Sequence, residues 1–282
     1  MLHPLKYFLQ SFNSSNASLH PLIKKIIKDK LPVFAGDADA LLSFLQYSTP
    51  ASGRNLYDKV VFLIFKSGAK EPFLCVKTVR NYNAKETIMR NFNNLKKLNT
   101  LTSGSIYENL FAKALYLHDD GENIFSIETA CPGRREKLTK KRLKAVVAKY
   151  IGFQEYVAKH NTDFIDDMEK FMKETVTQSE LKKADQWEIL RFMASLPLTG
   201  VRLPKLIQHG DVTEDNILLF KNGVCIVDCD FVGITQLPGF DLFGLFNRFN
   251  QSEVKELCYR YLPEYFTKIG VDLEGNKYEG LF

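Results

Sequence analysis

The sequence predicts an α+β fold in two parts, a small β-rich half followed by a mostly helical half. Short runs of β-branched and aromatic residues separated by tight turns fill the first half, as at 59–66 and 72–79. In the second half, apolar residues recur at helical spacing over longer stretches, as at 139–160. The breaker Cys131-Pro132-Gly133 lies between the two patterns and marks the expected boundary.

Residues 1–130 are expected to form an N-terminal lobe with a helical lead-in, an antiparallel sheet and one main helix. Apolar residues three and four positions apart predict the lead-in helix. Three strand-like runs joined by turns indicate an antiparallel meander. In chain order we expect a helix at 19–31, strands at 41–47, 59–66 and 72–79, a helix at 83–98, and strands at 111–118 and 123–129.

Residues 131–282 are expected to form a helical C-terminal lobe with a loop-and-strand insert. The helices are predicted from amphipathic periodicity, and the insert from a polar loop that leads into short apolar runs. We expect helices at 139–160, 164–175, 178–195 and 252–269, with the insert at 206–232.

The composition is that of an ordinary globular protein, with 45% apolar and 25% charged residues. The net charge of +5 is modest, and we expect no nucleic-acid partner. Five scattered cysteines show no zinc or disulfide spacing, which favours a reducing, cytoplasmic setting. No apolar run approaches the roughly 20 residues of a membrane span, and no signal peptide is expected.

The stretch from His209 to Asn216 carries the strongest chemical signal. It sets Asp211 and Asn216 five residues apart, and Asp228 follows twelve residues after Asn216 at the end of an apolar strand. A carboxylate such as Asp211 accepts the proton of an attacking hydroxyl, and the oxygens of Asn216 and Asp228 suit Mg²⁺. Asp and Asn also cap ordinary turns, but turn chemistry does not predict the later aspartate.

Residues 209–246 resemble the aminoglycoside phosphotransferase and choline kinase family, small-molecule relatives of the protein kinases. The resemblance implies a protein-kinase-like bilobal fold that uses ATP and Mg²⁺, with Asp211 as the catalytic base and Asn216 and Asp228 as metal ligands. It gives Asp241 a structural role, bonding back to the catalytic loop. For His209 we expect a hydrogen-bonded supporting role in the loop instead of a role in proton transfer, which Asp211 already fills. The matching pieces are His209-Gly210-Asp211, Asn216-Ile217-Leu218-Leu219, Val227-Asp228-Cys229-Asp230 and Pro238-Gly239-Phe240-Asp241-Leu242-Phe243-Gly244-Leu245-Phe246.

Lys77 lies on the third strand of the meander, where a kinase uses a lysine to hold the α- and β-phosphates. Its partner should be a carboxylate on the following helix. Glu86 is our candidate because it is the only carboxylate between residues 83 and 98. By the family resemblance, a glutamate would be expected later in this helix, nearer Asn91.

Two further segments are assigned to nucleotide binding. The turn at Ser52 and Gly53 lies between the first two strands, where its backbone N–H groups could cradle phosphate. The strand that runs into Pro132-Gly133 resembles the family's hinge, so backbone groups near Glu128 and Ala130 are expected to meet the adenine.

These features favour an ATP- and Mg²⁺-dependent kinase that acts on a hydroxyl of a small molecule, such as a sugar, an amino sugar or an amino alcohol. A protein kinase is one alternative, although twelve residues between Asp228 and Asp241 are few for an activation segment. A non-catalytic nucleotide-binding scaffold on the same fold is another. A basic run at 134–144 and an acidic cluster at 163–169 point to opposite substrates, so charge does not choose the acceptor. The oligomeric state stays open.

Overall fold

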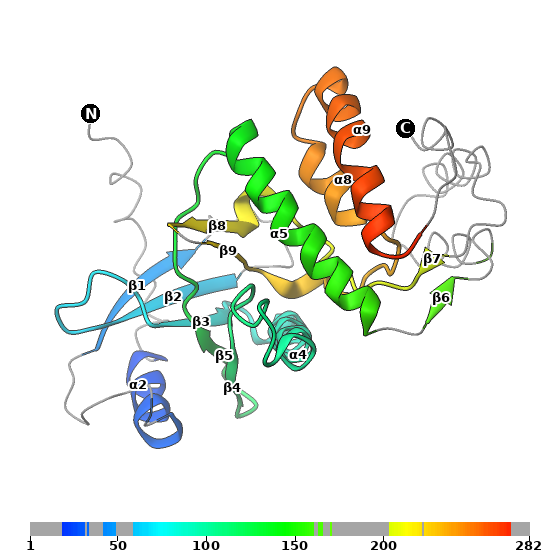
Figure 1. Ribbon diagram of the computed structural model, residues 1–282. Coiled ribbons are helices and arrows are strands. Elements are labelled where there is room, and N and C mark those ends of the chain that lie inside the picture. The colour runs from blue at the N-terminus through cyan, green and yellow to red at the C-terminus, as the bar shows by residue number, and fades with distance from the viewer. Residues whose placement is uncertain are drawn as a thin grey trace. The chain divides into compact units, whose positions relative to one another are not determined.

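The structure is a computed structural model in which residues 19–31, 33, 42–48, 59–160, 163–165, 170, 203–221 and 223–271 are described. It divides into two compact units, Met1–Pro132 and Gly133–Phe282 (Figure 1). Among the described residues, a β-sheet with helices α2 and α4 occupies the first unit, and helices with short two-stranded sheets occupy the second. The predicted α+β class is therefore confirmed. None of the helices in the described ranges is both long and apolar enough to cross a membrane.

The first unit is organised around a five-stranded antiparallel sheet in the order β1-β2-β3-β5-β4. The first three strands pair in chain order, as the meander predicted. β5 then pairs with β3, so the strand that ends nearest the unit boundary in sequence lies beside the strand that carries Lys77. The strands are β1 (Leu42–Ser48), β2 (Lys59–Lys66), β3 (Leu74–Val79), β4 (Ala114–Asp119) and β5 (Ile124–Thr129).

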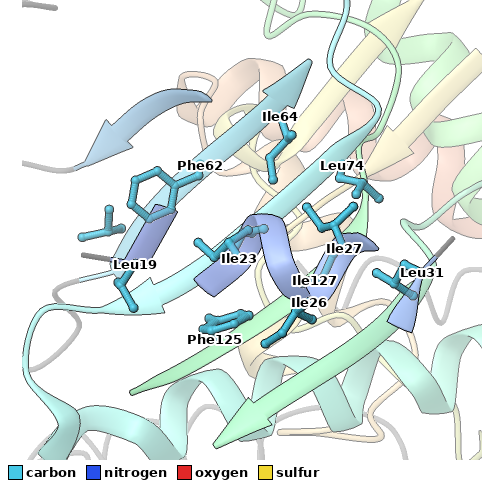
Figure 2. Close-up of a cluster of buried hydrophobic side chains, with 12 residues drawn as sticks. Leu19, Ile23, Ile26, Ile27, Leu31, Phe62, Ile64, Leu74, Phe125 and Ile127 are labelled. Atoms are coloured by element: carbon cyan, nitrogen blue, oxygen red, sulfur yellow. The ribbon is translucent and has the colours of Figure 1, made fainter. Parts of the chain in front are cut away.

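One face of this sheet is apolar and is covered by helix α2 (Leu19–Lys30). Figure 2 shows the buried side chains of α2 gathered against those of the strands. Full burial of such an aliphatic side chain contributes about 1.5–3 kcal/mol, so α2 is an integral part of the core of this unit. The cluster comprises Leu19, Ile23, Ile26, Ile27 and Leu31 with Val60, Phe62, Ile64, Leu74, Val76, Phe125 and Ile127.

The other face of the sheet carries Lys77 and packs against helix α4 (Lys85–Thr102), which follows the short 3-10 helix η2 (Tyr82–Ala84). Ile88 of α4 is fully buried against Val79 and Ile124. Because side chains alternate along a strand, Cys75, Lys77 and Val79 share this second face, and α4 shields its polar members from water.

The second unit contains helices α5 (Lys140–Lys159), α8 (Phe240–Phe246) and α9 (Gln251–Lys268), with α9 packed against the other two (Figure 1). The side chain of Thr139 caps α5 by accepting a hydrogen bond from the N–H of Arg142. β6 (Phe164–Ile165) pairs antiparallel with β7 (Leu203–Pro204), and β8 (Ile217–Phe220) forms a hairpin with β9 (Gly223–Ile226). The 3-10 helices η3 (Glu214–Asn216) and η4 (Cys229–Phe231) flank this hairpin.

The helix predicted at 164–175 is wrong at its start, because Phe164 and Ile165 pair with Pro204 and Leu203 as a strand. Tertiary pairing overrides the local helical spacing here. The helix predicted at 178–195 lies outside the described residues.

Candidate active site

The predicted catalytic loop connects β7 to β8, and within it Asp211 and Asn216 are brought into direct contact. The side-chain Nδ2 of Asn216 donates to Asp211 Oδ2 at 2.8 Å and to the Asp211 carbonyl at 3.0 Å. Helix η3 (Glu214–Asn216) forms the end of this turn and brings Asn216 back toward Asp211. Since both bonds use Nδ2, the carbonyl oxygen Oδ1 of Asn216 is the atom left to bind a cation.

The charge around this loop is strongly negative. Burial raises the pKa of Asp211, the nearby charges of Asp228, Asp230 and Asp215 raise it further, and the hydrogen bond from Asn216 opposes the shift. A carboxylate with a raised pKa is a better proton acceptor. The same crowding of carboxylates favours a bound cation, which relieves their mutual repulsion.

Asp228 is held in a strained backbone conformation. Its φ and ψ are both 69°, and it is the only non-glycine residue with positive φ among those described. Such a conformation costs on the order of 1–3 kcal/mol and concentrates at functional sites. The N–H of Val227 donates to the carbonyl of Asn216 at 2.9 Å, so the end of β9 is tied to the loop.

The donor set fits a divalent cation only in part. No group of three or more His, Cys, Asp or Glu side chains that could hold a metal occurs in the described part of the chain. Mg²⁺ in nucleotide sites is commonly held by one or two carboxylates together with phosphate oxygens and water. Asn216 and Asp228 therefore suit a cation that arrives with a nucleotide better than a metal that the protein alone would retain.

Asp241 holds the catalytic loop in place through hydrogen bonds to its backbone. Its carboxylate accepts hydrogen bonds from the backbone N–H of His209 at 2.6 Å and of Gly210 at 2.8 Å, and from the hydroxyl of Tyr150. The predicted bond from Asp241 back to the catalytic loop is thus confirmed. Burial raises the pKa of Asp241 to about 6, although these three hydrogen bonds lower it.

A polar network missed in the sequence extends this anchor. Gln154 donates to the hydroxyl oxygen of Tyr150 at 3.1 Å and to the carbonyl of Ile207 at 3.0 Å, and Gln208 donates to Gln154 at 2.8 Å. Burial, followed by the charge of Asp241, raises the pKa of Tyr150, so its hydroxyl remains a donor. The available signal was a Tyr and a Gln four residues apart on the apolar face of α5.

Gly210 allows helix η4 to approach the loop closely. Its φ is +85°, and a Cβ atom at this position would lie 2.4 Å from the carbonyl oxygen of Phe231. Only glycine can adopt this positive φ without strain and also leave room for the carbonyl of Phe231. His209 is buried beside it, and its backbone N–H is one of the groups that Asp241 holds.

The first unit holds the predicted nucleotide lysine. The Nζ atom of Lys77 lies 2.9 Å from Oε1 of Glu128 and donates to Oδ1 of Asn91 at 3.3 Å. The predicted partner is wrong: Glu86 is exposed on the first turn of α4, whereas Asn91, five residues later, is turned inward and fully buried. The carboxylate that meets Lys77 comes from a strand instead of this helix.

The hinge prediction is modified by the same contact. The side chain of Glu128 is engaged by Lys77, and its backbone lies between Cys75 of β3 and Ala114 of β4 in the sheet. The N–H of Ala130 donates to the carbonyl of Phe73 at 3.1 Å. The proposed phosphate turn at Ser52 and Gly53 lies outside the described residues.

Part of the basic run at 134–144 is neutralised within its own unit. The Nζ atom of Lys140 lies 3.5 Å from Oε1 of Glu253 and 3.6 Å from Oε2 of Glu256. Arg142 is paired with Glu136. The backbone of Arg134 pairs with that of Leu219 in β8. Lys140 and Arg142 are therefore explained by ion pairs on a solvated surface, and not by an anion-binding patch.

Residues 146–270 contain the catalytic loop, the β8–β9 hairpin and helix α8. This stretch matches the phosphotransferase enzyme family. The resemblance to the aminoglycoside phosphotransferases is therefore confirmed. No curated protein sequence matches the chain.

Solved structures extend the likeness to the fold. A variant of aminoglycoside 2'-phosphotransferase-IIIa in its GDP complex has a TM-score of 0.50 and 13% identity, and the match covers 89% of this chain and 85% of that one. Macrolide 2'-phosphotransferase type I also has a TM-score of 0.50, with 10% identity over 90% of this chain and 86% of the other. Aminoglycoside phosphotransferase APH(3'')-Id from Streptomyces rimosus ATCC10970 has a TM-score of 0.49 and 14% identity, with 91% and 95% covered. At such identities the first two comparisons show the fold, which is the kinase-like bilobal α+β fold that the sequence predicts.

Proposed function

We propose that this protein is a phosphotransferase that moves the γ-phosphoryl group of a nucleoside triphosphate to a hydroxyl of a small molecule. The observation that carries the proposal is the hydrogen-bonded pair of Asp211 and Asn216, tied through the backbone to the strained Asp228. This arrangement supplies a proton acceptor and two oxygen ligands within one short loop and hairpin. The family match over residues 146–270 supports it independently.

In this mechanism Asp211 accepts a hydrogen bond from the acceptor hydroxyl and orients its oxygen toward the γ-phosphorus. As the new O–P bond forms, the bond from phosphorus to the bridging oxygen breaks, and the hydroxyl proton passes to Asp211. The products are the phosphorylated acceptor and the nucleoside diphosphate. The raised pKa of Asp211 suits this proton transfer.

Lys77 is proposed to bind the nucleotide phosphates from the first unit, through electrostatic stabilisation of the developing charge. Asn216 and Asp228 would hold Mg²⁺ that enters with the nucleotide. The bound ion would neutralise charge on the transferred phosphoryl group. ATP is the expected donor, and GTP is tested beside it because the 2'-phosphotransferase of similar fold is a GDP complex.

The acceptor is proposed to be a hydroxyl-bearing metabolite or antibiotic of the sugar and amino-sugar class. The solved structures of similar fold are named for aminoglycosides and macrolides, which motivates this choice. We propose that the first unit, residues 1–130, serves nucleotide binding, and that residues 131–282 provide the catalytic loop and the acceptor site.

A coupled assay of ADP or GDP release tests the proposal with panels of aminoglycosides, macrolides, sugars and amino alcohols. Wild type should release diphosphate faster with at least one acceptor, and Asp211→Asn should lose this stimulation by about 10²-fold or more. Asp215→Asn is the matched control, because it makes the same chemical change on an exposed neighbour in η3. Equal loss in both variants would argue against a base at Asp211. Nucleotide binding without transfer to any acceptor would favour a scaffold.

A further inference from the structure

The polar cluster around Lys77 has a charge arrangement that the proposed catalytic roles do not explain. Lys77 is 7% exposed, Glu128 is 4% exposed and Asn91 is fully buried. One cation, one anion and one neutral amide thus share an interior site, with the ammonium 2.9 Å from the carboxylate and 3.3 Å from the amide oxygen. A buried charge is tolerated when it is paired and hydrogen-bonded, and Lys77 and Glu128 carry opposite charges in direct contact.

The register of the sheet brings Lys77 and Glu128 together. Lys77 lies directly opposite Ser126 in the antiparallel pair of β3 and β5, and Glu128 is two residues further along β5 on the same face. Diagonal neighbours of this kind are within reach of long side chains. The small side chain of Ser126 leaves this diagonal open. Both ends of the ion pair are therefore fixed by hydrogen-bonded strands.

We infer that Glu128 is the residue that positions Lys77 for the nucleotide phosphates, and that Asn91 is the neutral complement which this strand carboxylate requires. The inference rests on the proposed function of Lys77. Helix α4 contributes the amide of Asn91 to the cluster, whereas the carboxylate of Glu128 that contacts the ammonium comes from the sheet. A glutamate at position 91 in addition to Glu128 would place two buried carboxylates on one ammonium, which is unfavourable.

We therefore expect a carboxylate to orient Lys77 equally well from the strand or from the helix. Moving it from the strand to the helix, by combining Glu128→Gln with Asn91→Glu, keeps one cation, one anion and one amide in the cluster. Each single change leaves the cluster with an unbalanced charge. The double variant should therefore recover a function that both single variants lose. A role for Glu128 in packing alone does not predict this recovery.

The test is Mg-ATP and Mg-GTP binding by calorimetry to wild type, Glu128→Gln, Asn91→Glu and the double variant. We expect each single variant to bind the preferred nucleotide about ten- to a hundredfold more weakly, the range for loss of a hydrogen bond to a charged group. The double variant should regain most of the affinity. Glu86→Gln, an exposed carboxylate of the same helix, should bind as wild type does. Wild-type affinity in Glu128→Gln, or a double variant no better than the singles, would overturn the inference.

A stability cycle separates this inference from the proposed function. If wild type binds neither nucleotide, the proposed function fails, and the ion pair is then judged by urea unfolding of Lys77→Met, Glu128→Gln and their combination. Removing both charges should leave a protein that unfolds at a higher urea concentration than either single variant does, because no buried charge is left without its partner. Strictly additive losses would show that the two side chains are not coupled, and the inference would fail.

Discussion

Replacement of Asp241 by asparagine tests how the catalytic loop is anchored. The carboxylate is 1% exposed and accepts hydrogen bonds from two backbone N–H groups and one hydroxyl. Asparagine keeps one acceptor oxygen but turns its NH₂ group toward one of these donors. A buried donor left without an acceptor costs about 1–3 kcal/mol, so Asp241→Asn should lower the free energy of unfolding and reduce transfer by displacing the loop.

The effect should depend on pH in a defined direction. Burial raises the pKa of Asp241 to about 6 in the folded protein, from 3.8 for the free side chain. The folded state then binds the proton more tightly than the unfolded chain, so this group's contribution to stability is fully present below 3.8 and is lost as the pH rises through 6. The whole window corresponds to about 3 kcal/mol.

The assay is reversible urea unfolding followed by circular dichroism at intervals between pH 4.5 and 7.5. Asp241→Asn removes the titrating group, so the stability advantage of wild type over the variant should shrink as the pH rises across this range. Carboxylates that do not interact with Asp241 titrate equally in both proteins and cancel in the difference. A difference that is constant with pH, or that grows toward pH 7.5, would refute the reasoning.

Three further pairs of substitutions probe the backbone and the core. Asp228→Gly should unfold with a free energy about 1 kcal/mol higher than Asp228→Ala, because glycine adopts positive φ without strain; chemical denaturation checks this, and equal stabilities would contradict it. Gly210→Ala should lower the free energy of unfolding more than Gly233→Ala does. Both glycines have positive φ, but only at Gly210 would a Cβ lie 2.4 Å from an oxygen. Thermal unfolding compares the two variants, and equal losses would show that this steric clash does not matter. Ile27→Ala should cost about 2–5 kcal/mol because it empties a fully buried site under the sheet, while exposed Lys25→Ala should change the unfolding free energy by less than about 0.5 kcal/mol in the same urea titration.

The elements with strong local patterns were predictable from the sequence. Alternating and β-branched runs predicted β2 and β3, the strand that carries Lys77. Helical spacing predicted α2 and α5. The sequence placed Asp211 and Asn216 five residues apart in one loop, but the hydrogen bond between their side chains was not predicted and comes from the turn that includes η3.

Contacts that depend on sheet register or on distant chain segments were not predictable. The carboxylate of Glu128 reaches Lys77 only because β5 pairs with β3 in one register, across 51 positions of sequence. Tyr150 meets Asp241 across 91 positions, through packing of the second unit. In both cases the secondary-structure propensity of the nearby residues carries no information about the contact, and tertiary packing determines the partner.

The central claim is that Asp211 takes the proton of a hydroxyl during phosphoryl transfer. The most direct measurement is incubation of wild type and Asp211→Asn with Mg²⁺, isotopically labelled nucleotide and a metabolite extract, followed by mass spectrometry for compounds that gain one labelled phosphoryl group. Wild type should form at least one such product, the yield should fall by about 10²-fold or more with Asp211→Asn, and Asp215→Asn should form it as wild type does. The same labelled products in equal yield from wild type and Asp211→Asn would contradict it.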